Sequence, residues 1–400
     1  MKSESVIKKT GTGSNDFSKS LKNIFGKYSM YIFLAVIIVL FQILTDGILL
    51  RPINITNVIL QNSYVFILTI GMLMLVLLGD IDLSVGSVMA FTGAISAMLI
   101  INYDLNPVIS VIICLLIGVA IGAWQGFWVA YVNVPAFIAT LAGLLTFRGL
   151  TIVILDGKTI ASYPDIFQSI GSGFIPDLFN GSLHIVTLLI GAAITVGYVF
   201  ISLKDRDKNQ KLGAEIEAKS YFISKLIVFS LAITWITYVL ANYEGIPNVL
   251  IIVVAFALLA KYITSRTTVG RHLYAIGGNE KAASLSGINT KKVKFLTFAF
   301  MGFMAAVAGL IFSARLNAAS ASAGDGFELD AIAACYIGGA STSGGIGTVI
   351  GALVGAMVMA LLNNGMSLMG VGVDWQQAIK GLVLLFAVAI DIYNKKKKEN

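Results

Sequence analysis

From Lys261 to Lys294 the chain reads KYITSRTTVGRHLYAIGGNEKAASLSGINTKKVK, the longest polar interruption in the second half of a very apolar sequence. This stretch carries seven Lys or Arg residues and one acid, Glu280. Asn279 is a good helix N-cap, Glu280 suits the positive end of a helix, and Gly287 suits a C-cap. We therefore predict a short capped helix over residues 279–287. It is either a solvated connector between two membrane spans or a docking helix for a cytoplasmic partner.

Composition indicates an all-α polytopic membrane protein. Of 400 residues, 57% are hydrophobic and 12% are charged, and the mean hydropathy is +0.87. No soluble domain of this length needs so much apolar sequence. The net charge of +7 does not indicate nucleic-acid binding, because the charges lie between apolar segments. Cys114 and Cys335 both fall inside apolar segments, so we expect packing roles and no metal site.

About twelve apolar segments are close to the ~20 residues that cross a bilayer. The predicted spans are Tyr28–Thr45, Val58–Leu78, Ser84–Ile101, Val108–Tyr131, Ala136–Leu155, Leu183–Leu203, Tyr221–Leu240, Pro247–Ile263, Phe295–Ala314, Phe327–Gly339, Ile346–Leu368 and Asp374–Tyr393. Phe327–Gly339 is short for a span, and we count it as a short crossing; a re-entrant segment is the alternative.

Charge sets the expected orientation. If all twelve segments cross, the inner side holds 22 Lys/Arg residues and the outer loops hold three. Positively charged loops stay in the cytoplasm, so both termini are predicted to be cytoplasmic. If Phe327–Gly339 did not cross, the lysine-rich tail at Lys395–Lys398 would lie outside.

A second polar element lies between the second and third spans. Asp80, Asp82 and Ser84 fall in a predicted tight inner turn close to the bilayer, where acids are costly unless they are solvated or paired. Asp82 or Ser84 can cap the following helix, which is an ordinary structural role. A further role of this turn in gating or in a subunit contact stays open.

Four motifs carry a resemblance to a known family: GDIDLSVGSVMAFTGA (Gly79–Ala94), AFIATLAGLLTFRG (Ala136–Gly149), GRHLYAIGGNEKAASLSGI (Gly270–Ile288) and GFELDAIAACYIGGASTSGGIGTVIGALVGA (Gly326–Ala356). They resemble the membrane permeases of bacterial sugar ATP-binding-cassette importers, which include ribose, xylose, arabinose and galactose systems. The resemblance implies a vitamin-B12-permease-like (type II importer) helical fold and a permease dimer. It also implies a cytoplasmic ATP-binding subunit and an extracytoplasmic sugar-binding protein as partners.

The apolar runs and charges predict a division of the chain, and the resemblance adds two further parts to it. Residues 1–27 are the expected cytoplasmic arm, 28–394 the transmembrane permease domain, and 395–400 a cytoplasmic tail. An added helix pair at 183–240 resembles the longer xylose and multiple-monosaccharide permeases. Residues 264–294 correspond to the family's cytoplasmic coupling loop, which implies that the predicted helix contacts the ATPase. The expected coupling residues are Asn279, Glu280, Ala282, Ala283 and Gly287.

Charged and polar residues within spans are candidates for the transport path. A buried arginine needs a partner, so Arg148 is predicted to pair with Glu328 or Asp330; the alternative is that it reaches the outer interface alone. A neutral sugar needs hydrogen-bonding groups and aromatic faces. The candidates by residue type are Asn62, Tyr64, Trp124, Gln125, Trp128, Asn363 and Asn364.

Two function classes fit these features. The first is a permease subunit powered by a separate ATPase, because the chain has no complete phosphate-binding loop, no nucleophile–base pair and no expected cofactor. The second is a self-sufficient secondary transporter, which normally needs a carboxylate near the membrane midplane. No acid falls at the centre of a predicted span, so the sequence favours the first class.

Overall fold

The computed structural model describes residues 30–179, 181, 183–213 and 218–399. The predicted arm at 1–27 and the start of the first predicted span lie outside the described residues. The described elements are a helix at Met30–Leu44, α2 (Pro52–Leu78), α3 (Val85–Ala97), η1 (Met98–Asn102), α4 (Pro107–Ala130), α5 (Ala136–Leu155), β1 (Ile160–Ala161), α6 (Asp165–Ser172), α7 (Ile185–Lys211), α8 (Lys219–Ala241), α9 (Asn248–Arg266), α10 (Thr268–Gly278), α11 (Glu280–Leu285), α12 (Thr290–Leu316), β2 (Ala318–Ala319), α13 (Phe327–Ile337), α14 (Val349–Leu368) and α15 (Val373–Glu399).

The fold is an all-α polytopic bundle, as predicted. Within the described part of the chain, nine helices are long and apolar enough to cross a membrane. The other three predicted spans correspond to the helix at Met30–Leu44, to α13 and to α15. Helix α15 continues to Glu399, into the predicted tail.

Helix α2 forms the centre of the bundle and packs against α9, α12, α13 and α14. Residues 62–78 of α2 are all buried. Helices α4 and α12 approach closely because glycines face each other there. A methyl group at Gly122 would collide with the carbonyl of Phe298, and one at Gly302 with the carbonyl of Gly118. Small residues of this kind bring membrane helices into backbone contact.

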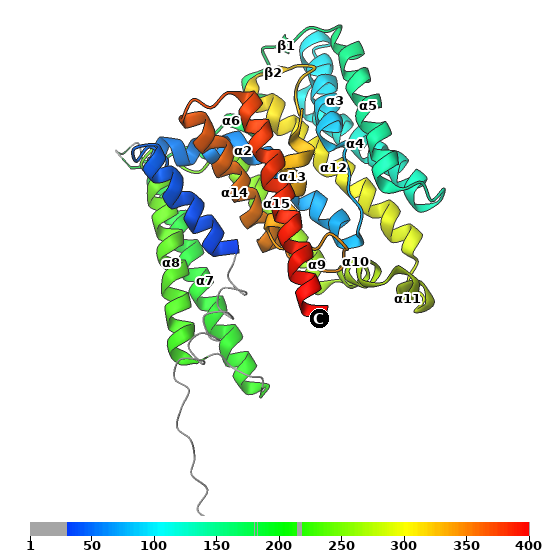
Figure 1. The fold of residues 1–400 in the computed structure, drawn as a ribbon. Helices are drawn as coiled ribbons and strands as arrows, with labels where there is room; N and C mark the ends of the chain where they lie inside the picture. Colours follow the sequence, from blue (N-terminus) through cyan, green and yellow to red (C-terminus); the bar gives the residue numbers. More distant parts are fainter. Residues whose placement is uncertain (1–29, 180, 182, 214–217, 400) are drawn as a thin grey trace, which may run out of the picture.

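The bundle has two distinct ends (Figure 1). Strands β1 and β2 pair antiparallel at one end, with Ile160 opposite Ala319. Helices α10 and α11 lie across the other end. These are called below the β1 end and the α11 end.

Helix α13 is too short to cross the bundle alone. Its 11 residues extend about 16 Å, roughly half of the ~30 Å hydrocarbon core. The chain before α13 pairs at the β1 end through Ala318 and Ala319. The chain after α13 reaches the α11 end, where Gly345 donates to the carbonyl of Leu77. The predicted short crossing at 327–339 is a half-helix between two non-helical segments, which together pass from one end of the bundle to the other. Such backbone is tolerated at membrane depth when it is buried in protein.

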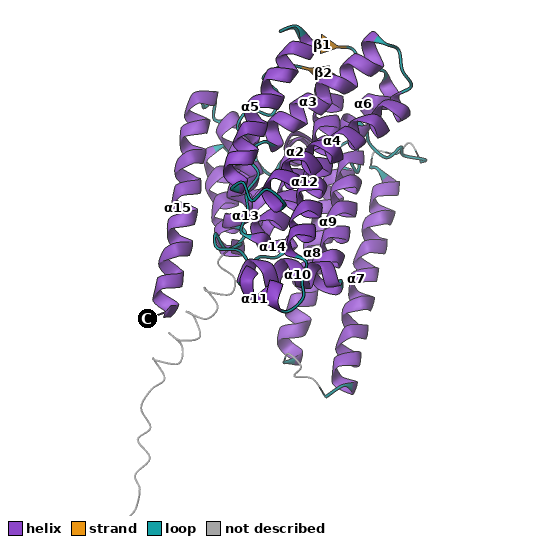
Figure 2. Cartoon of the chain, turned by 90° about the vertical axis from the view of Figure 1, so that its right-hand side faces the viewer, coloured by secondary structure: helices purple, strands orange, loops and turns teal. Residues whose placement is uncertain are grey.

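The predicted added pair is present as α7 and α8. The two helices pack on each other at the edge of the bundle, and Figure 2 shows both extending past α11. Most of their side chains are exposed in the isolated chain. The first residues of the predicted charged linker are helical, because α7 continues to Lys211.

Candidate functional site

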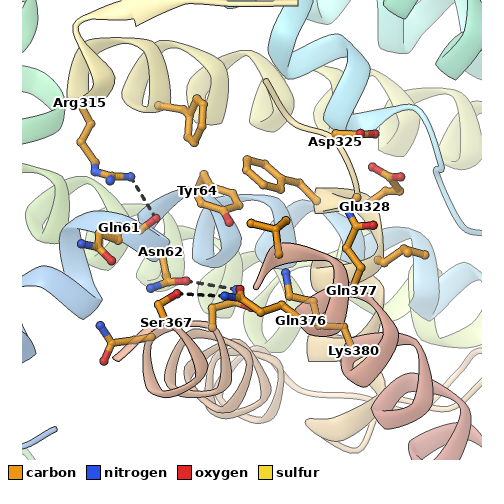
Figure 3. Close-up of a pocket in the computed structure, with 17 residues that line it drawn as sticks. Gln61, Asn62, Tyr64, Arg315, Asp325, Glu328, Ser367, Gln376, Gln377 and Lys380 are labelled. Atoms are coloured by element: carbon orange, nitrogen blue, oxygen red, sulfur yellow. Dashed lines mark hydrogen bonds between the residues drawn. The ribbon is translucent and has the colours of Figure 1, made fainter. Parts of the chain in front are cut away.

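A cavity of about 530 Å³ lies in the half of the bundle toward the β1 end. Figure 3 shows Asn62 and Tyr64 reaching it from α2, and Gln376 and Lys380 from α15. Helices α12, α13 and α14 supply the other walls. The cavity is lined by Gln61, Asn62, Tyr64, Phe312, Arg315, Asp325, Gly326, Phe327, Glu328, Leu329, Asn363, Asn364, Ser367, Val373, Gln376, Gln377 and Lys380.

One wall of the cavity is aromatic. The rings of Tyr64 and Phe327 stack with their centroids 3.9 Å apart and an interplanar angle of 19°. Phe312 meets both rings edge-on, at 5.5 Å from Tyr64 and 5.3 Å from Phe327. The wall therefore joins three elements, α2, α12 and α13, through ring contacts.

The floor of the cavity is polar. Lys380 Nζ donates to Asp330 Oδ2 at 3.1 Å, and Asn363 Nδ2 donates to the same oxygen at 3.3 Å. Asn363 Nδ2 also donates to Asn62 Oδ1 at 3.4 Å. The Asp330 side chain is fully buried, whereas Lys380 and Asn363 line the cavity. Asp330 thus anchors the floor from below.

The predicted direct ion pair of Arg148 with Glu328 or Asp330 is not formed: Asp330 pairs with Lys380, and Glu328 interacts with Arg148 electrostatically without a direct ion pair. Arg148 Nη1 donates to the carbonyls of Ala321 and Ala323 at 2.8 and 2.6 Å, and Nη2 lies 3.8 Å from the exposed carboxylate of Asp325. The depth of these residues in the membrane, counted from the ends of the predicted spans, does not identify the partners of Arg148, because the chain between α12 and α13 enters the bundle as a loop. Its carbonyls need donors, and Arg148 supplies them.

Asp330 pairs with Lys380 of α15. The half-helix places Asp330 inside the bundle and not near the end of a span, as the predicted spans imply. Residue type alone also misses Gln376, Gln377 and Lys380 as cavity residues. The i, i+4 spacing of Gln376 and Lys380 places them on one face of a helix, and this spacing is the available signal.

Four of the seven predicted path residues line this cavity, namely Asn62, Tyr64, Asn363 and Asn364. Asn364 exchanges two hydrogen bonds with Asn54, at 2.9 and 3.1 Å, which join α14 to α2.

The other three predicted path residues lie elsewhere. Gln125 Nε2 donates to Ser84 Oγ at 2.7 Å and holds α4 to the start of α3. Trp124 and Trp128 pack edge-on at 6.5 Å on the exposed side of α4. The glycine face of α4 turns toward α12 and directs these rings away from the cavity.

The predicted turn at Asp80–Ser84 connects the left-handed end of α2 at Gly79 to the buried start of α3, and its last two residues are in turn conformation. Asp82 Oδ1 accepts from the backbone amide and the hydroxyl of Ser84, at 2.8 and 2.6 Å. The side chain of Ser84 makes no capping bond of its own to α3. Asp82 therefore has the structural, helix-initiating role that the sequence allowed.

The short helix of the opening stretch is present as α11. Asn279 Oδ1 accepts from the amide of Ala282 at 3.0 Å, as expected for an N-cap, and Gly287 has a φ of +86°. Ala282 is exposed, but Ala283 is buried against its own chain with 5% exposure. Among the large hydrophobic side chains of the described residues, Leu285 is the most exposed, at 91%.

A charged cluster fixes α11 to the bundle. Lys294 Nζ donates to Glu280 Oε2 at 2.9 Å and lies 3.9 Å from Asp80 Oδ2. Burial raises the pKa of Asp80, and Lys294 opposes that shift. One lysine of α12 thus contacts both α11 and the connection that follows α2.

Backbone contacts reinforce this attachment. A methyl group at Gly277, in α10, would collide with the carbonyl of Leu77 and the amide of Gly345. The Tyr274 hydroxyl donates to the carbonyl of Gly347 at 2.8 Å. Helix α10 therefore touches the end of α2 and the approach to α14, both of which line the cavity farther along.

Comparisons with known proteins agree across nearly the whole chain. The xylose transport system permease protein of Haemophilus influenzae is 42% identical over 92% of this chain and 97% of its own length. The Escherichia coli xylose transport system permease protein is 39% identical over 90% of each chain. The ribose import permease protein of Haemophilus influenzae is 36% identical over 86% of this chain and 87% of its own length. No solved structure matches the chain. The family described as "Branched-chain amino acid transport system / permease component" matches residues 54–388, and the chain belongs to this family.

Proposed function

We propose that the chain is the membrane-spanning permease subunit of an ATP-driven importer for a monosaccharide, with a pentose such as xylose as the substrate. The observation that carries the proposal is the similarity to two xylose transport permeases over at least 90% of this chain. The cavity supports it, because amide side chains and aromatic rings suit a neutral molecule rich in hydroxyl groups.

The proposed orientation places the α11 end in the cytoplasm of a bacterial cell and both termini on that side. The charge asymmetry of the loops supports this orientation. The cavity then lies in the outer half of the membrane, where an extracytoplasmic binding protein delivers the sugar. A second copy of the permease completes the path.

A separate cytoplasmic ATPase supplies the energy, and residues 264–294 are the proposed coupling loop. Helix α11 presents Leu285 and Ala282 to the ATPase, while Ala283 packs inward. Of the expected coupling residues, Ala283 supports α11 from behind the contact surface, because its side chain is buried against its own chain.

Movement of the docked helix has a physical route to the cavity. Lys294 links α11 to Asp80, just beyond the end of α2. Gly277 and Tyr274 link α10 to the ends of α2 and α14. Because packed helices move as rigid bodies, a push at the α11 end shifts the helices whose other halves form the cavity.

Reconstitution tests the proposal. Proteoliposomes that hold the permease and its ATPase, with ATP inside and the binding protein outside, are expected to accumulate D-xylose. Omitting the ATPase, the ATP or the binding protein should each reduce uptake to the level of empty liposomes. Uptake by the permease alone at the rate of the complete complex would overturn the proposal.

A further inference from the structure

The floor of the cavity gathers side chains from four helices onto one carboxylate. Asp330 of α13 accepts from Lys380 of α15 and from Asn363 of α14, and Asn363 also donates to Asn62 of α2. At 3.3 and 3.4 Å, both bonds of Asn363 are longer than a normal N–H···O bond. Because Asn363 lines the cavity, a ligand there can compete for these bonds.

Two acceptors at this floor have no donor within the described part of the chain. They are Asp330 Oδ1 and Asn363 Oδ1, and both atoms are buried. Buried acceptors are normally satisfied, and an exception points to a missing donor. For Asn363, which lines the cavity, a donor that fits is a hydroxyl group of a ligand bound there.

The aromatic wall stands beside this polar floor. Tyr64, Phe312 and Phe327 line the same cavity as Asn363 and Lys380. A pentose in its ring form has hydroxyl groups around its edge and C–H groups on its faces. The polar floor therefore suits the hydroxyl groups of the sugar, and the aromatic wall suits its C–H faces.

We propose that Asn62, Asn363 and Lys380 form a subsite within the permease for hydroxyl groups of a pentose, and that Asp330 is the positioning residue that holds it. This inference rests on the proposed function and deepens it. Lys380 lies about 10 Å along α15 from its first residue, so the subsite is below the mouth of the cavity. The sugar binds there after release from the binding protein. Its further movement toward the α11 end requires that the hydrogen bonds of Asn363 to Asn62 and Asp330 break.

Direct binding tests the subsite without the binding protein. The probe is D-xylose at millimolar concentration, added to the permease–ATPase complex in nanodiscs and followed by saturation-transfer NMR. The mono-deoxy-D-xyloses are compared under the same conditions. We expect that removal of one hydroxyl weakens binding to the parent about tenfold, as for the loss of a hydrogen bond. In Asn363→Leu, D-xylose should bind about tenfold more weakly than in the parent. The deoxy sugar that lacks the hydroxyl bound by Asn363 should then bind this variant almost as well as D-xylose does.

The matched control is Asn242→Leu, an exposed asparagine at the end of α8 outside the cavity, which should bind like the parent. If Asn363→Leu fails to assemble with the ATPase, Asn363→Ala replaces it. Asp330→Asn should change the ratio of D-xylose to deoxy-sugar affinity, whereas a purely structural role would weaken both equally.

Two results overturn the subsite. One is the absence of D-xylose binding to the parent complex; the other is an equal loss for every deoxy sugar in the parent and in the Asn363 variants. Uptake by the complete importer separates these results from the proposed function. If uptake proceeds and the subsite test fails, only the subsite is wrong. If the complete importer takes up no sugar, the proposed function fails.

Discussion

Leu285 gives the sharpest test of how the permease meets its ATPase. This side chain is 91% exposed on α11, in a segment that the proposed orientation places in the cytoplasm and not in lipid. Full burial of a leucine side chain stabilises a complex by about 1.5–3 kcal/mol. Since each 1.4 kcal/mol is tenfold in affinity, Leu285→Ser should weaken ATPase binding by about tenfold to a hundredfold.

The assay measures the dissociation constant between the purified ATPase and the permease immobilised in nanodiscs. Leu178→Ser is the matched control, because Leu178 is 78% exposed in the loop before α7 and should not affect binding. Leu285 is preferred to Ala283, because a bulky residue at the buried Ala283 would also disrupt the packing of α11. If Leu285→Ser binds the ATPase as tightly as Leu178→Ser, α11 is only a connector and the docking argument is wrong.

Three further predictions concern coupling, loop stability and orientation. Lys294→Met should leave the ATPase bound but reduce sugar-stimulated ATP hydrolysis. Because the loss of Lys294 raises the pKa of Asp80 further, Asp80→Asn in the same chain should recover part of the hydrolysis. No recovery would contradict the proposed link between α11 and Asp80. Arg148→Met removes two charged hydrogen bonds to loop carbonyls and should cost about 3 kcal/mol or more in the free energy of unfolding, measured in nanodiscs. Asp325→Asn, at an exposed partner, should cost less than about 1 kcal/mol; equal losses would refute the assignment. A cysteine at Lys396 in a cysteine-free chain should resist an impermeant thiol reagent in intact cells, and rapid labelling would contradict a cytoplasmic C-terminus.

Helix positions follow from the sequence where one apolar run forms one helix. The predicted span Ala136–Leu155 has the same bounds as α5, because Pro135 and Asp156 mark its ends. The predicted short helix at 279–287 contains α11, whose N-cap is Asn279. Local signals of this kind act over a few residues and need no knowledge of the partners in space.

The cavity residues could be predicted only in part, because residue type does not give the face of a helix. Trp124 and Trp128 resemble Tyr64 as aromatic candidates, yet they lie on the exposed side of α4. The glycines at positions 118 and 122 identify the packed side of α4, and their spacing could have excluded these rings.

The ion pairs could not be predicted, because they depend on a segment that is not a regular span. The loop at 320–326 enters the bundle, and its carbonyls accept hydrogen bonds from Arg148. Helix α13 then begins inside the bundle, and Asp330 meets Lys380 from a helix far along the chain. Depth counted from span ends assumes continuous helices, and this assumption fails here.

The source of energy tests the central claim most directly, because a buried carboxylate such as that of Asp330 is also found in secondary transporters. The measurement is D-xylose uptake by the complete importer in proteoliposomes, with ionophores that abolish proton and sodium gradients. We predict that uptake continues at the same rate with ATP inside and stops without ATP. Uptake by the permease without the ATPase, driven by an imposed proton or sodium gradient, would contradict it.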